Sequence, residues 1–257
     1  MEHRAMNTSK VYICGAGPGD PELITVKGYR LLSKCDVVLY DRLVSKRLVE
    51  KIPSTIKKIY VGRDVGRGTC GHQSRTNKLM ATYALRGKNV LRLKGGDPLI
   101  FGRGGEEAEY LRRHNVKFEL VPGISSAIAA PAYAGIPLTH RRYSSSMAFV
   151  TGHEDERKKH SEADLKAIAS AVDTIVILMG VEKIDKIVQR LRSGGLKGTT
   201  KVAIIEKGTT NDQKVIVGNL DNITKRAVKY KVGAPAVIVV GAVVSFSPRL
   251  RWFSTNG

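Results

Sequence analysis

Short runs of β-branched residues alternate along this sequence with longer segments of helical pattern. Such runs occupy residues 11–14, 36–40 and 89–94 in the first half and residues 174–178 and 235–241 in the second. This alternation is typical of α/β layers, because a crossover between two parallel strands usually contains a helix. The sequence therefore predicts an α/β fold with a largely parallel sheet, and a second sheet formed by the second half of the chain.

A segment with several prolines and a glycine, PAYAGIPLTHRRYSS at residues 131–145, interrupts this periodicity near the middle of the chain. Interruptions of this kind favour loops. With 257 residues, of which 42% are hydrophobic, the chain is long enough for two small domains. We expect an N-terminal α/β lobe at residues 10–135 and a C-terminal α/β lobe at residues 136–247.

The chain carries 43 lysine and arginine residues against 23 aspartate and glutamate residues, a net charge of +20. This excess indicates an anionic partner, which could be nucleic acid, an acidic membrane surface or a small polyanion. The basic residues are scattered in ones and twos and only 6% of the residues are aromatic, so no segment resembles a basic arm or a stacking platform for bases. We therefore expect no nucleic-acid partner and keep nucleic acid only as the runner-up.

The longest apolar stretch, residues 236–244, is far shorter than the roughly 20 residues that a membrane-spanning helix needs. The first ten residues contain no apolar segment like that of a signal peptide. The three cysteines, Cys14, Cys35 and Cys70, lack CxxC spacing, which argues against a zinc ribbon or a disulfide framework and suits a reducing compartment. We expect a cytoplasmic protein with no membrane association and no bound metal.

Four of the apolar runs are followed by a segment that contains glycine. These segments are GAGPGD at residues 15–20, GGDP at 95–98, MG at 179–180 and EKGT at 206–209. In open α/β sheets ligands bind at the carboxyl ends of strands, where the loops converge. Because the four loops come from both halves of the chain, they predict a ligand shared between two lobes.

The first of these loops does not fit a phosphate group. A dinucleotide-binding loop needs free backbone amides at the start of a helix, but Pro18 removes one amide and Asp20 adds a negative charge. No GxxxxGK[ST] motif occurs in the chain. Asp20 could equally cap a helix that begins at Pro21, since aspartate is a good N-cap and proline is favoured at the first helical position. A cationic nucleoside without phosphates suits such loops, and S-adenosyl-L-methionine is such a ligand.

Six motifs connect these loops with the rest of the chain. They are GAGPGDPELIT (15–25), YDRLVS (40–45), GGDPLIFGRGGEE (95–107), VPGISSAIAAPAYAGIPLTHR (121–141), TGH (151–153) and IEKGTTNDQ (205–213). In these motifs and their order, from about residue 10 to about residue 245, the sequence resembles the tetrapyrrole methylase family, and within it the enzymes that methylate uroporphyrinogen III.

The resemblance implies two α/β/α lobes with the ligand cleft between them, and a homodimer. It implies an enzyme that uses S-adenosyl-L-methionine, which leaves as S-adenosyl-L-homocysteine, to add two methyl groups to uroporphyrinogen III and give precorrin-2. That product feeds sirohaem or cobalamin biosynthesis. The substrate carries carboxylates on every pyrrole ring, so a basic cleft that orients it would account for the positive charge of the chain.

Residue by residue, the resemblance assigns a donor-binding role to ten positions. They are Pro18, Gly95, Gly96, Asp97, Ile100, Ser125, Ser126, Met179, Gly208 and Ala236. The chain departs from the family's pattern in two places. Ser125 and Ser126 stand where the family usually has Thr-Ala, and Leu178 replaces an aromatic residue, so stacking on adenine is not expected there.

The resemblance assigns two catalytic positions. Asp41, directly after the run at residues 36–40, matches the family's proposed acceptor of the proton whose removal restores the ring after methylation. An acidic residue at this distance from a glycine loop could instead hold a ribose hydroxyl or cap a helix. Arg63 stands where the family has a proposed proton donor, often lysine; because arginine stays protonated, we favour a carboxylate clamp at this position.

Other basic residues are candidates for the substrate's carboxylates, and each could instead be a surface or structural residue. They are Arg67, Arg103, Arg141 and Arg142. Three histidines, His72, His140 and His153, could titrate near neutral pH, but their spacing assigns them no role.

Two other functions fit parts of this pattern. One is a related methylase that acts later, on a precorrin, or that modifies diphthamide. The other is a basic nucleic-acid-binding module, which would bind DNA or RNA with steep salt dependence and transfer no methyl group. The agreement through GRGGEE and GIPLTHR favours methylation of uroporphyrinogen III. We expect methylation alone, because the sequence has no appended dehydrogenase or chelatase domain.

Overall fold

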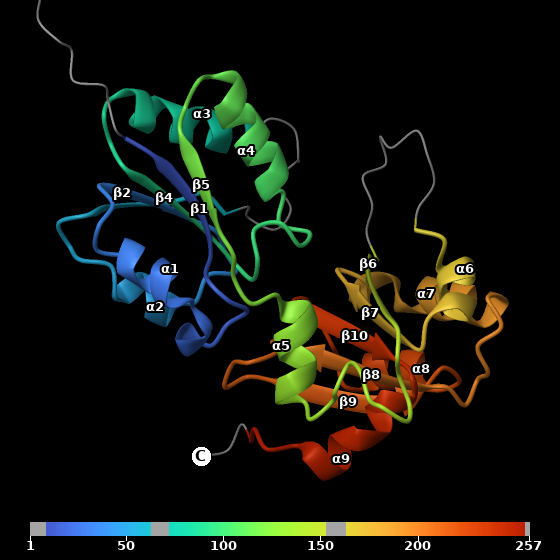
Figure 1. Cartoon of the computed structure of the whole chain (residues 1–257). Helices are drawn as coiled ribbons and strands as arrows, with labels where there is room; N and C mark the ends of the chain where they lie inside the picture. The colour runs from blue at the N-terminus through green and yellow to red at the C-terminus, as the bar shows by residue number, and fades with distance from the viewer. Residues whose placement is uncertain (1–8, 63–71, 153–162, 255–257) are drawn as a thin grey trace, which may run out of the picture. The chain divides into compact units, whose positions relative to one another are not determined.

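The computed structural model describes residues 9–62, 72–152 and 163–254. The chain divides into two compact units, Met1–Ser125 and Ser126–Gly257. Each unit contains one five-stranded sheet with helices packed on it (Figure 1). The predicted α/β class, with one sheet in each half of the chain, is confirmed.

The sheet of the first unit is parallel throughout and has the strand order β3-β2-β4-β1-β5. Its strands are β1 Val11–Gly15, β2 Val37–Tyr40, β3 Lys57–Tyr60, β4 Val90–Lys94 and β5 Phe118–Val121. The central strand β4 is buried at every position. Because all five strands run in the same direction, their carboxyl ends and the loops that follow lie at one edge of the sheet.

Helices cover both faces of this sheet (Figure 1). They are α1 Val26–Leu31, α2 Lys46–Glu50, α3 His72–Leu85 and α4 Gly104–Arg113. The core on one face joins the strands to α1 and α2, and the core on the other face joins them to α3 and α4. Alternate residues of β1, β2 and β4 supply the two cores, as the period of two in a strand requires.

The helical segment that begins at Pro21 is divided in the structure. A short 3-10 helix, η1, covers Pro21–Leu23, and α1 begins only at Val26 after an extended Thr25. The Asp20 carboxylate accepts a hydrogen bond from the Glu22 amide at 2.9 Å, which confirms that Asp20 caps the turn that starts at Pro21. Thr25 caps α1 in turn, through its Oγ1 and the Gly28 amide at 3.1 Å.

The sheet of the second unit has the order β6-β7-β10-β8-β9 and is mostly antiparallel. Its strands are β6 Met147–Thr151, β7 Thr174–Leu178, β8 Lys201–Glu206, β9 Lys214–Asn219 and β10 Ala236–Val240. Only β6 and β7 pair in parallel. The expectation of a largely parallel sheet therefore holds for the first unit alone. The reason is local: β8 and β9 are joined by a short turn at residues 207–213 instead of a helical crossover, and such a turn makes a hairpin.

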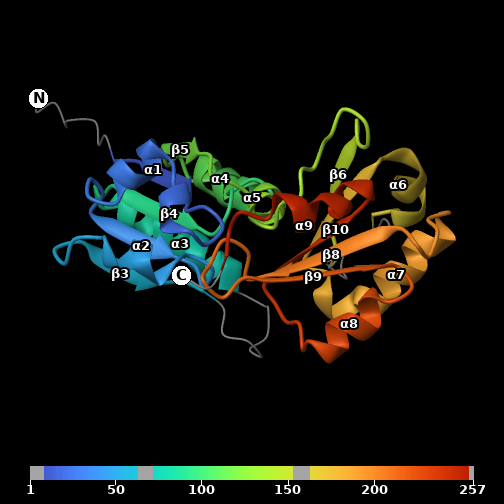
Figure 2. The same cartoon turned by 90° about the horizontal axis from the view of Figure 1, so that it is seen from below.

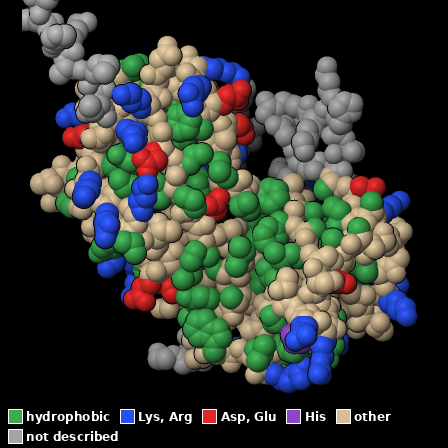
Figure 3. Space-filling model, viewed as in Figure 1, with side chains coloured by type: hydrophobic (Ala, Val, Ile, Leu, Met, Phe, Trp, Pro, Cys, Tyr) green, Lys and Arg blue, Asp and Glu red, His purple; other side chains and the backbone are tan. Residues whose placement is uncertain are grey.

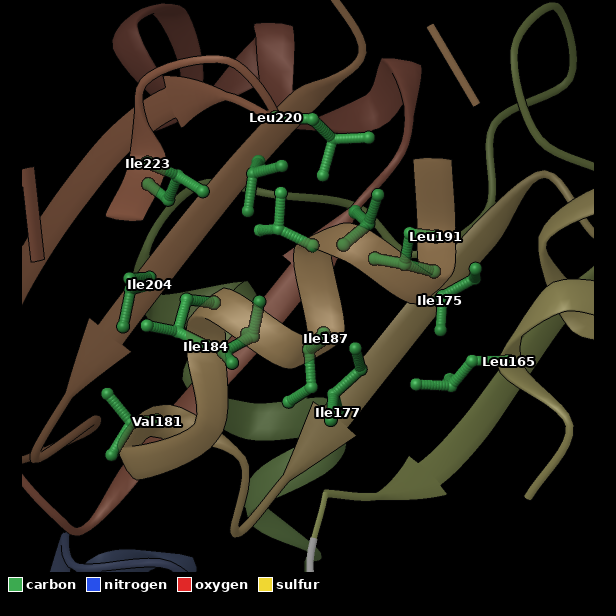
Figure 4. Packing of buried hydrophobic residues seen from close by; sticks show 14 of the residues in the cluster. Leu165, Ile175, Ile177, Val181, Ile184, Ile187, Leu191, Ile204, Leu220 and Ile223 are labelled. Atoms are coloured by element: carbon green, nitrogen blue, oxygen red, sulfur yellow. The ribbon is translucent and has the colours of Figure 1, made fainter. Parts of the chain in front are cut away.

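Two groups of helices cover this second sheet, one on each face (Figure 2). On one side lie α6 Leu165–Ala171, α7 Ile184–Ser193 and α8 Ile223–Lys229, and the 3-10 helix η2 Val181–Lys183 precedes α7. On the other side α5 Ser126–Tyr133 and the 3-10 helix η3 Ala242–Phe246 pack on the strands, and α9 Ser247–Leu250 follows η3. Figure 4 shows how aliphatic side chains of β7, β8, α7 and α8 interlock in the larger of these two cores.

The division between the units lies after Ser125, ten residues before the expected end of the first lobe at residue 135. Helix α5 belongs to the second unit because Ala127, Ala130 and Ala134 pack against its sheet. Pro131 is tolerated within α5 near its C-terminal end. The prolines and the glycine at residues 131–145 thus mark the end of a helix and a loop inside the second unit, and do not mark the boundary.

No helix within the described part of the chain is long and apolar enough to cross a membrane. Among the same residues, no group of three or more histidine, cysteine, aspartate or glutamate side chains could hold a metal ion.

The core of the second unit gives a direct test of the fold. Leu191 on α7 is fully buried, with 0% exposure, whereas Val228 on α8 is 75% exposed. We expect Leu191→Ala to lower the free energy of unfolding by about 2–5 kcal/mol, because it removes buried methyl groups and leaves a cavity. Val228→Ala should change it by less than about 0.5 kcal/mol. Urea unfolding followed by circular dichroism measures both, and similar values for the two variants would contradict the packing described for α7.

Candidate active site

Three loops at the carboxyl edge of the first sheet are in backbone contact. The loop after β1 and the loop after β4 exchange two hydrogen bonds, Gly17 N to Gly96 O at 3.3 Å and Gly96 N to Gly17 O at 2.7 Å. A Cβ atom placed on Gly15 would lie 2.5 Å from Gly96 O and 2.6 Å from the Cα of Gly123, in the loop after β5. The three loops therefore approach so closely that only glycine fits at their junction.

Asp97 orders the loop after β4 and joins it to the loop after β5. Its Oδ1 accepts hydrogen bonds from the amides of Leu99 at 2.8 Å and Ile100 at 3.1 Å, and its Oδ2 accepts one from the Gly123 amide at 2.9 Å. Both oxygens thus have backbone partners within the first unit. These hydrogen bonds give Asp97 a role in organising the loops. Of the two glycines before it, Gly95 lies close to Leu43 and Gly96 forms the bridge to Gly17.

Strained backbone and exposed apolar side chains follow this junction. Phe101 and Arg103 have positive φ angles of 53° and 59°, a conformation that side chains other than glycine rarely adopt. Ile100 and Phe101 are about two-fifths exposed despite their size, and Leu99 more than half. Strain of this kind is concentrated at functional sites, so the segment after β4 is a candidate for ligand contact.

The second unit repeats this pattern at the ends of β7 and β8. Met179, directly after β7, has a φ of 54° and is 52% exposed. Lys207 and Thr209, after β8, have positive φ angles as well. Gly208 lies between them, and a Cβ on it would meet the Cβ of Ala130 at 2.5 Å, so the turn packs directly on α5. Ala236 begins β10.

A cluster of charged groups lies on the α3 and α4 side of the first sheet. Arg92 Nη2 contacts both carboxylate oxygens of Asp41, at 2.7 and 2.8 Å, and Arg92 Nε donates to Glu107 Oε1 at 3.1 Å. Lys94 Nζ donates to the same Glu107 oxygen at 3.0 Å and lies 3.8 Å from Asp41 Oδ2. Arg92, Lys94 and Glu107 are buried, whereas the Asp41 side chain is 28% exposed.

The two cations of this cluster respond differently to burial. Burial opposes the charge on Arg92, but the carboxylates of Glu107 and Asp41 outweigh it and raise the pKa of the guanidinium. Burial, together with repulsion from Arg92, lowers the pKa of Lys94 below its ordinary value in spite of the same two carboxylates. Arg92 is therefore the permanent positive charge of the cluster.

Asp41 is accordingly the one member of the cluster that reaches solvent. Its carboxylate is paired with Arg92 and does not cap α2, whose N-cap position is Ser45. It follows β2, at the same sheet edge as the glycine loops after β1 and β4. Within the first unit, the structure thus brings the predicted catalytic aspartate and two of the predicted glycine loops, those after β1 and β4, to one edge.

The other predicted residues lie at several different places in the two units. Arg103 pairs with the exposed Glu106, and Arg141 and Arg142 are exposed in the second unit. Ser125 is buried at the end of the first unit, Ser126 begins α5, and Pro18 lies in the turn between Gly17 and η1. Arg63, Arg67, Cys70 and His153, together with the side chain of His72, lie outside the described residues.

Three members of the charged cluster were not anticipated as site residues: Arg92, Lys94 and Glu107. A signal for them exists in the sequence, because VLRLK places two cations at alternate positions of a strand that is otherwise apolar. Alternate positions point to the same face, so both cations enter one core and require buried carboxylates there.

The family of this chain follows from comparison with known proteins. A model of the Tetrapyrrole (Corrin/Porphyrin) Methylases matches residues 10–224. The chain belongs to the tetrapyrrole methylases. The sequence is 50% identical, over 93% of each chain, to an S-adenosyl-L-methionine-dependent uroporphyrinogen III methyltransferase of Methanosarcina barkeri. It is 45% identical to a uroporphyrinogen-III C-methyltransferase of Bacillus subtilis, over 96% of this chain and 95% of the relative.

Solved structures of tetrapyrrole methylases agree with this assignment. A crystal structure of uroporphyrin-III C-methyltransferase from Thermus thermophilus, complexed with S-adenyl homocysteine, is similar with a TM-score of 0.78 and 38% identity, over 92% of this chain and 93% of that chain. A cobalt precorrin-4 methyltransferase is similar with a TM-score of 0.82 and 29% identity, over 95% and 99% of the two chains. Within the family, the fold is thus shared by enzymes named for different tetrapyrroles.

Two glycines of this tetrapyrrole methylase offer a matched test of the loop junction. A Cβ on Gly15 would overlap backbone atoms of Gly96 and Gly123, whereas a Cβ on Gly105, in α4, would meet nothing within 4 Å. We expect Gly15→Ala to destabilise the first unit by about 1–3 kcal/mol, since backbone must move. Gly105→Ala should be neutral or stabilising by up to about 1 kcal/mol. Thermal unfolding of both variants distinguishes them, and an unchanged midpoint for Gly15→Ala would contradict the close approach.

Proposed function

We propose that this protein is an S-adenosyl-L-methionine-dependent C-methyltransferase that adds two methyl groups to uroporphyrinogen III and gives precorrin-2, in sirohaem or cobalamin biosynthesis. The observation that carries the proposal is the identity of 45–50% to relatives named for this substrate, over more than nine-tenths of each chain. The similar cobalt precorrin-4 methyltransferase has only 29% identity, which makes a later precorrin the weaker choice of substrate.

The donor-binding residues are proposed on the resemblance to the family, and the features of each strand-end loop are consistent with that role. The glycine junction around Gly95 and Gly96 presents backbone, and Ile100 and Met179 present exposed apolar side chains. Asp97 organises the first of these loops, and Pro18, Ser125, Ser126, Gly208 and Ala236 complete the proposed set. A phosphate would have to compete with Asp97 for the amides of Leu99, Ile100 and Gly123, so these loops suit a donor without phosphates. When bound, the donor supplies a methyl group on a sulfonium.

The residues of the chain then have two tasks, positioning and proton removal. Methyl transfer to a pyrrole carbon requires in-line geometry, and most of the acceleration comes from holding the reactants in that geometry. Methylation leaves a positive charge on the pyrrole ring, because the methylated carbon is already fully substituted, and a proton must then leave another position of the macrocycle. The Asp41 carboxylate, which is partly exposed and oriented by Arg92, can accept that proton. Arg63, Arg67, Arg103 and Arg141 are proposed to bind the carboxylates of the tetrapyrrole, with Arg63 as a clamp because arginine does not release its proton.

The cell compartment and the assembly are part of the same proposal. We infer a cytoplasmic homodimer, on the resemblance to the family. Size-exclusion chromatography with light scattering tests the assembly directly, because the chain has a mass of 28.1 kDa.

The function is tested by incubating the purified protein with methyl-labelled donor and uroporphyrinogen III under anaerobic conditions, followed by mass analysis. We expect a product that carries two additional methyl groups. Asp41→Asn should lower kcat by about 10²–10⁴-fold, the range that general-base catalysis contributes. Glu50→Gln, at the end of the short surface helix α2, serves as the matched control and should leave kcat unchanged.

The outcomes separate the parts of the proposal. Methylation of a precorrin in place of uroporphyrinogen III would reassign the substrate within the family. Transfer of no methyl group to any tetrapyrrole would overturn the proposed function. Unchanged turnover in Asp41→Asn would overturn only the role of Asp41.

A further inference from the structure

Glu107 is a fully buried carboxylate on α4 that the proposed chemistry does not use. Its Oε1 accepts three hydrogen bonds, from Arg92 Nε at 3.1 Å, from Lys94 Nζ at 3.0 Å and from Gln73 Nε2 at 3.0 Å. Its Oε2 has no hydrogen-bond partner among the described residues. One oxygen of Glu107 therefore joins β4, α3 and α4, while a buried polar atom is left without a partner, a costly arrangement that requires a reason.

The guanidinium of Arg92 shows what this arrangement achieves. Its Nε donates to Glu107, its Nη1 donates to the backbone carbonyl of Leu93 at 3.3 Å, and its Nη2 contacts both oxygens of Asp41. All three nitrogens of a planar group are thus engaged, so its plane and its direction are fixed. Without Glu107, the Nε–H would be buried with no acceptor, and the group could rotate to find one.

We propose that Glu107 is a positioning residue for methyl transfer: it fixes the guanidinium of Arg92, which in turn holds the Asp41 carboxylate at the carboxyl end of β2. The inference rests on the proposed function, because it takes Asp41 as the proton acceptor. Glu107 lies behind Arg92 and acts on the reacting atoms only through it.

Both the charge and the shape of the Glu107 side chain matter for the balance of the cluster. The cluster contains two cations, Arg92 and Lys94, and two carboxylates, Asp41 and Glu107. The remaining polar contact to Glu107 comes from the uncharged Gln73 on α3. A glutamine at 107 would leave two buried cations facing one carboxylate, and it would place an amide NH₂ group where Oε2 now has no partner.

A purely structural role for Glu107 predicts a different outcome from a positioning role. If Glu107 only stabilises the core, its replacement lowers the amount of folded protein but not the turnover of each folded molecule. If it orients Asp41, its replacement lowers kcat per site, and this loss disappears once Asp41 is no longer a carboxylate. A double-mutant cycle separates these cases, because it measures the coupling between two residues.

The experiment compares Glu107→Gln, Asp41→Asn and the double variant with the unmodified protein. Turnover is expressed per site that binds S-adenosyl-L-homocysteine, counted by calorimetry, so that unfolded protein does not contribute. We expect Glu107→Gln to lower kcat by about 10–100-fold, the scale of a misplacement near 1 Å, with KM for both substrates changed by less than about threefold. In the Asp41→Asn background, the same change should lower kcat by less than about twofold.

Glu109 on the same helix provides the matched control. It is exposed and pairs with Arg113 one turn further on, so Glu109→Gln should leave kcat within about twofold of the unmodified protein. If Glu107→Gln does not fold, Glu107→Asp replaces it in the cycle, since it keeps the charge and withdraws the oxygens by about one methylene. The same loss of kcat and the same coupling to Asp41 are expected.

Each result has one meaning. The positioning role would be overturned if Glu107→Gln lowered kcat by the same factor whether residue 41 is aspartate or asparagine. It would also be overturned if Asp41→Asn lowered kcat while Glu107→Gln left kcat per site unchanged. An unchanged kcat in Asp41→Asn would overturn both the role of Asp41 and this role of Glu107. Failure of the unmodified protein to methylate any tetrapyrrole would instead overturn the function on which the inference rests.

Discussion

Two buried cations on β4 are the constraint on which the first unit depends. Arg92 and Lys94 point into the same core as Val90, where ionised groups are expensive unless carboxylates face them. Glu107 and Asp41 supply those carboxylates from two different elements, α4 and the end of β2. The positions of these elements are thereby linked, and a shift of either would leave a buried charge unpaired.

The glycine junction imposes a second constraint at the same edge of the sheet. Gly15, Gly96 and Gly123 follow three neighbouring strands and approach one another more closely than any side chain allows. Asp97, in the β4 loop, adds one hydrogen bond, which its carboxylate accepts from the Gly123 amide of the β5 loop. Since β4 carries the buried cations and leads directly into Gly95 and Gly96, the side chain that orients Asp41 and one loop of the glycine junction belong to the same segment of chain. The geometry of the candidate site is thus set largely by β4.

Much of this arrangement could be predicted from the sequence, because it depends on local patterns. The apolar runs at residues 11–14, 36–40, 89–94, 174–178 and 235–241 predicted β1, β2, β4, β7 and β10, and the glycines after β1 and β4 indicated the edge at which the site lies. Asp20 and Pro21 predicted the start of a helical turn correctly. The short helices α2 and α9 could not be predicted, since neither is long enough to show a helical period.

The remaining features depend on contacts between distant residues, which no local pattern contains. The insertion of β10 between β7 and β8 is one such feature, because both of these strands precede β10 in the chain. The place of the boundary is another: the alanine face of α5 decides it, and the prolines that follow do not. The ion pairs of Arg92 are a third: Asp41 lies 51 positions before Arg92 in the chain, and Glu107 lies 15 positions after it.

The distribution of charge explains how an aspartate can serve a polyanionic substrate. The buried cluster of Arg92, Lys94, Asp41 and Glu107 contains as many carboxylates as cations, so the excess of positive charge lies outside it. Figure 3 shows lysine and arginine side chains in small groups over the visible surface of both units. Such surface charge attracts an anion from a distance and loses strength with salt. At short range an unpaired aspartate would repel the carboxylates of the proposed substrate. Pairing with Arg92 offsets that repulsion while leaving part of Asp41 exposed, so that attraction and proton removal can be combined in one protein.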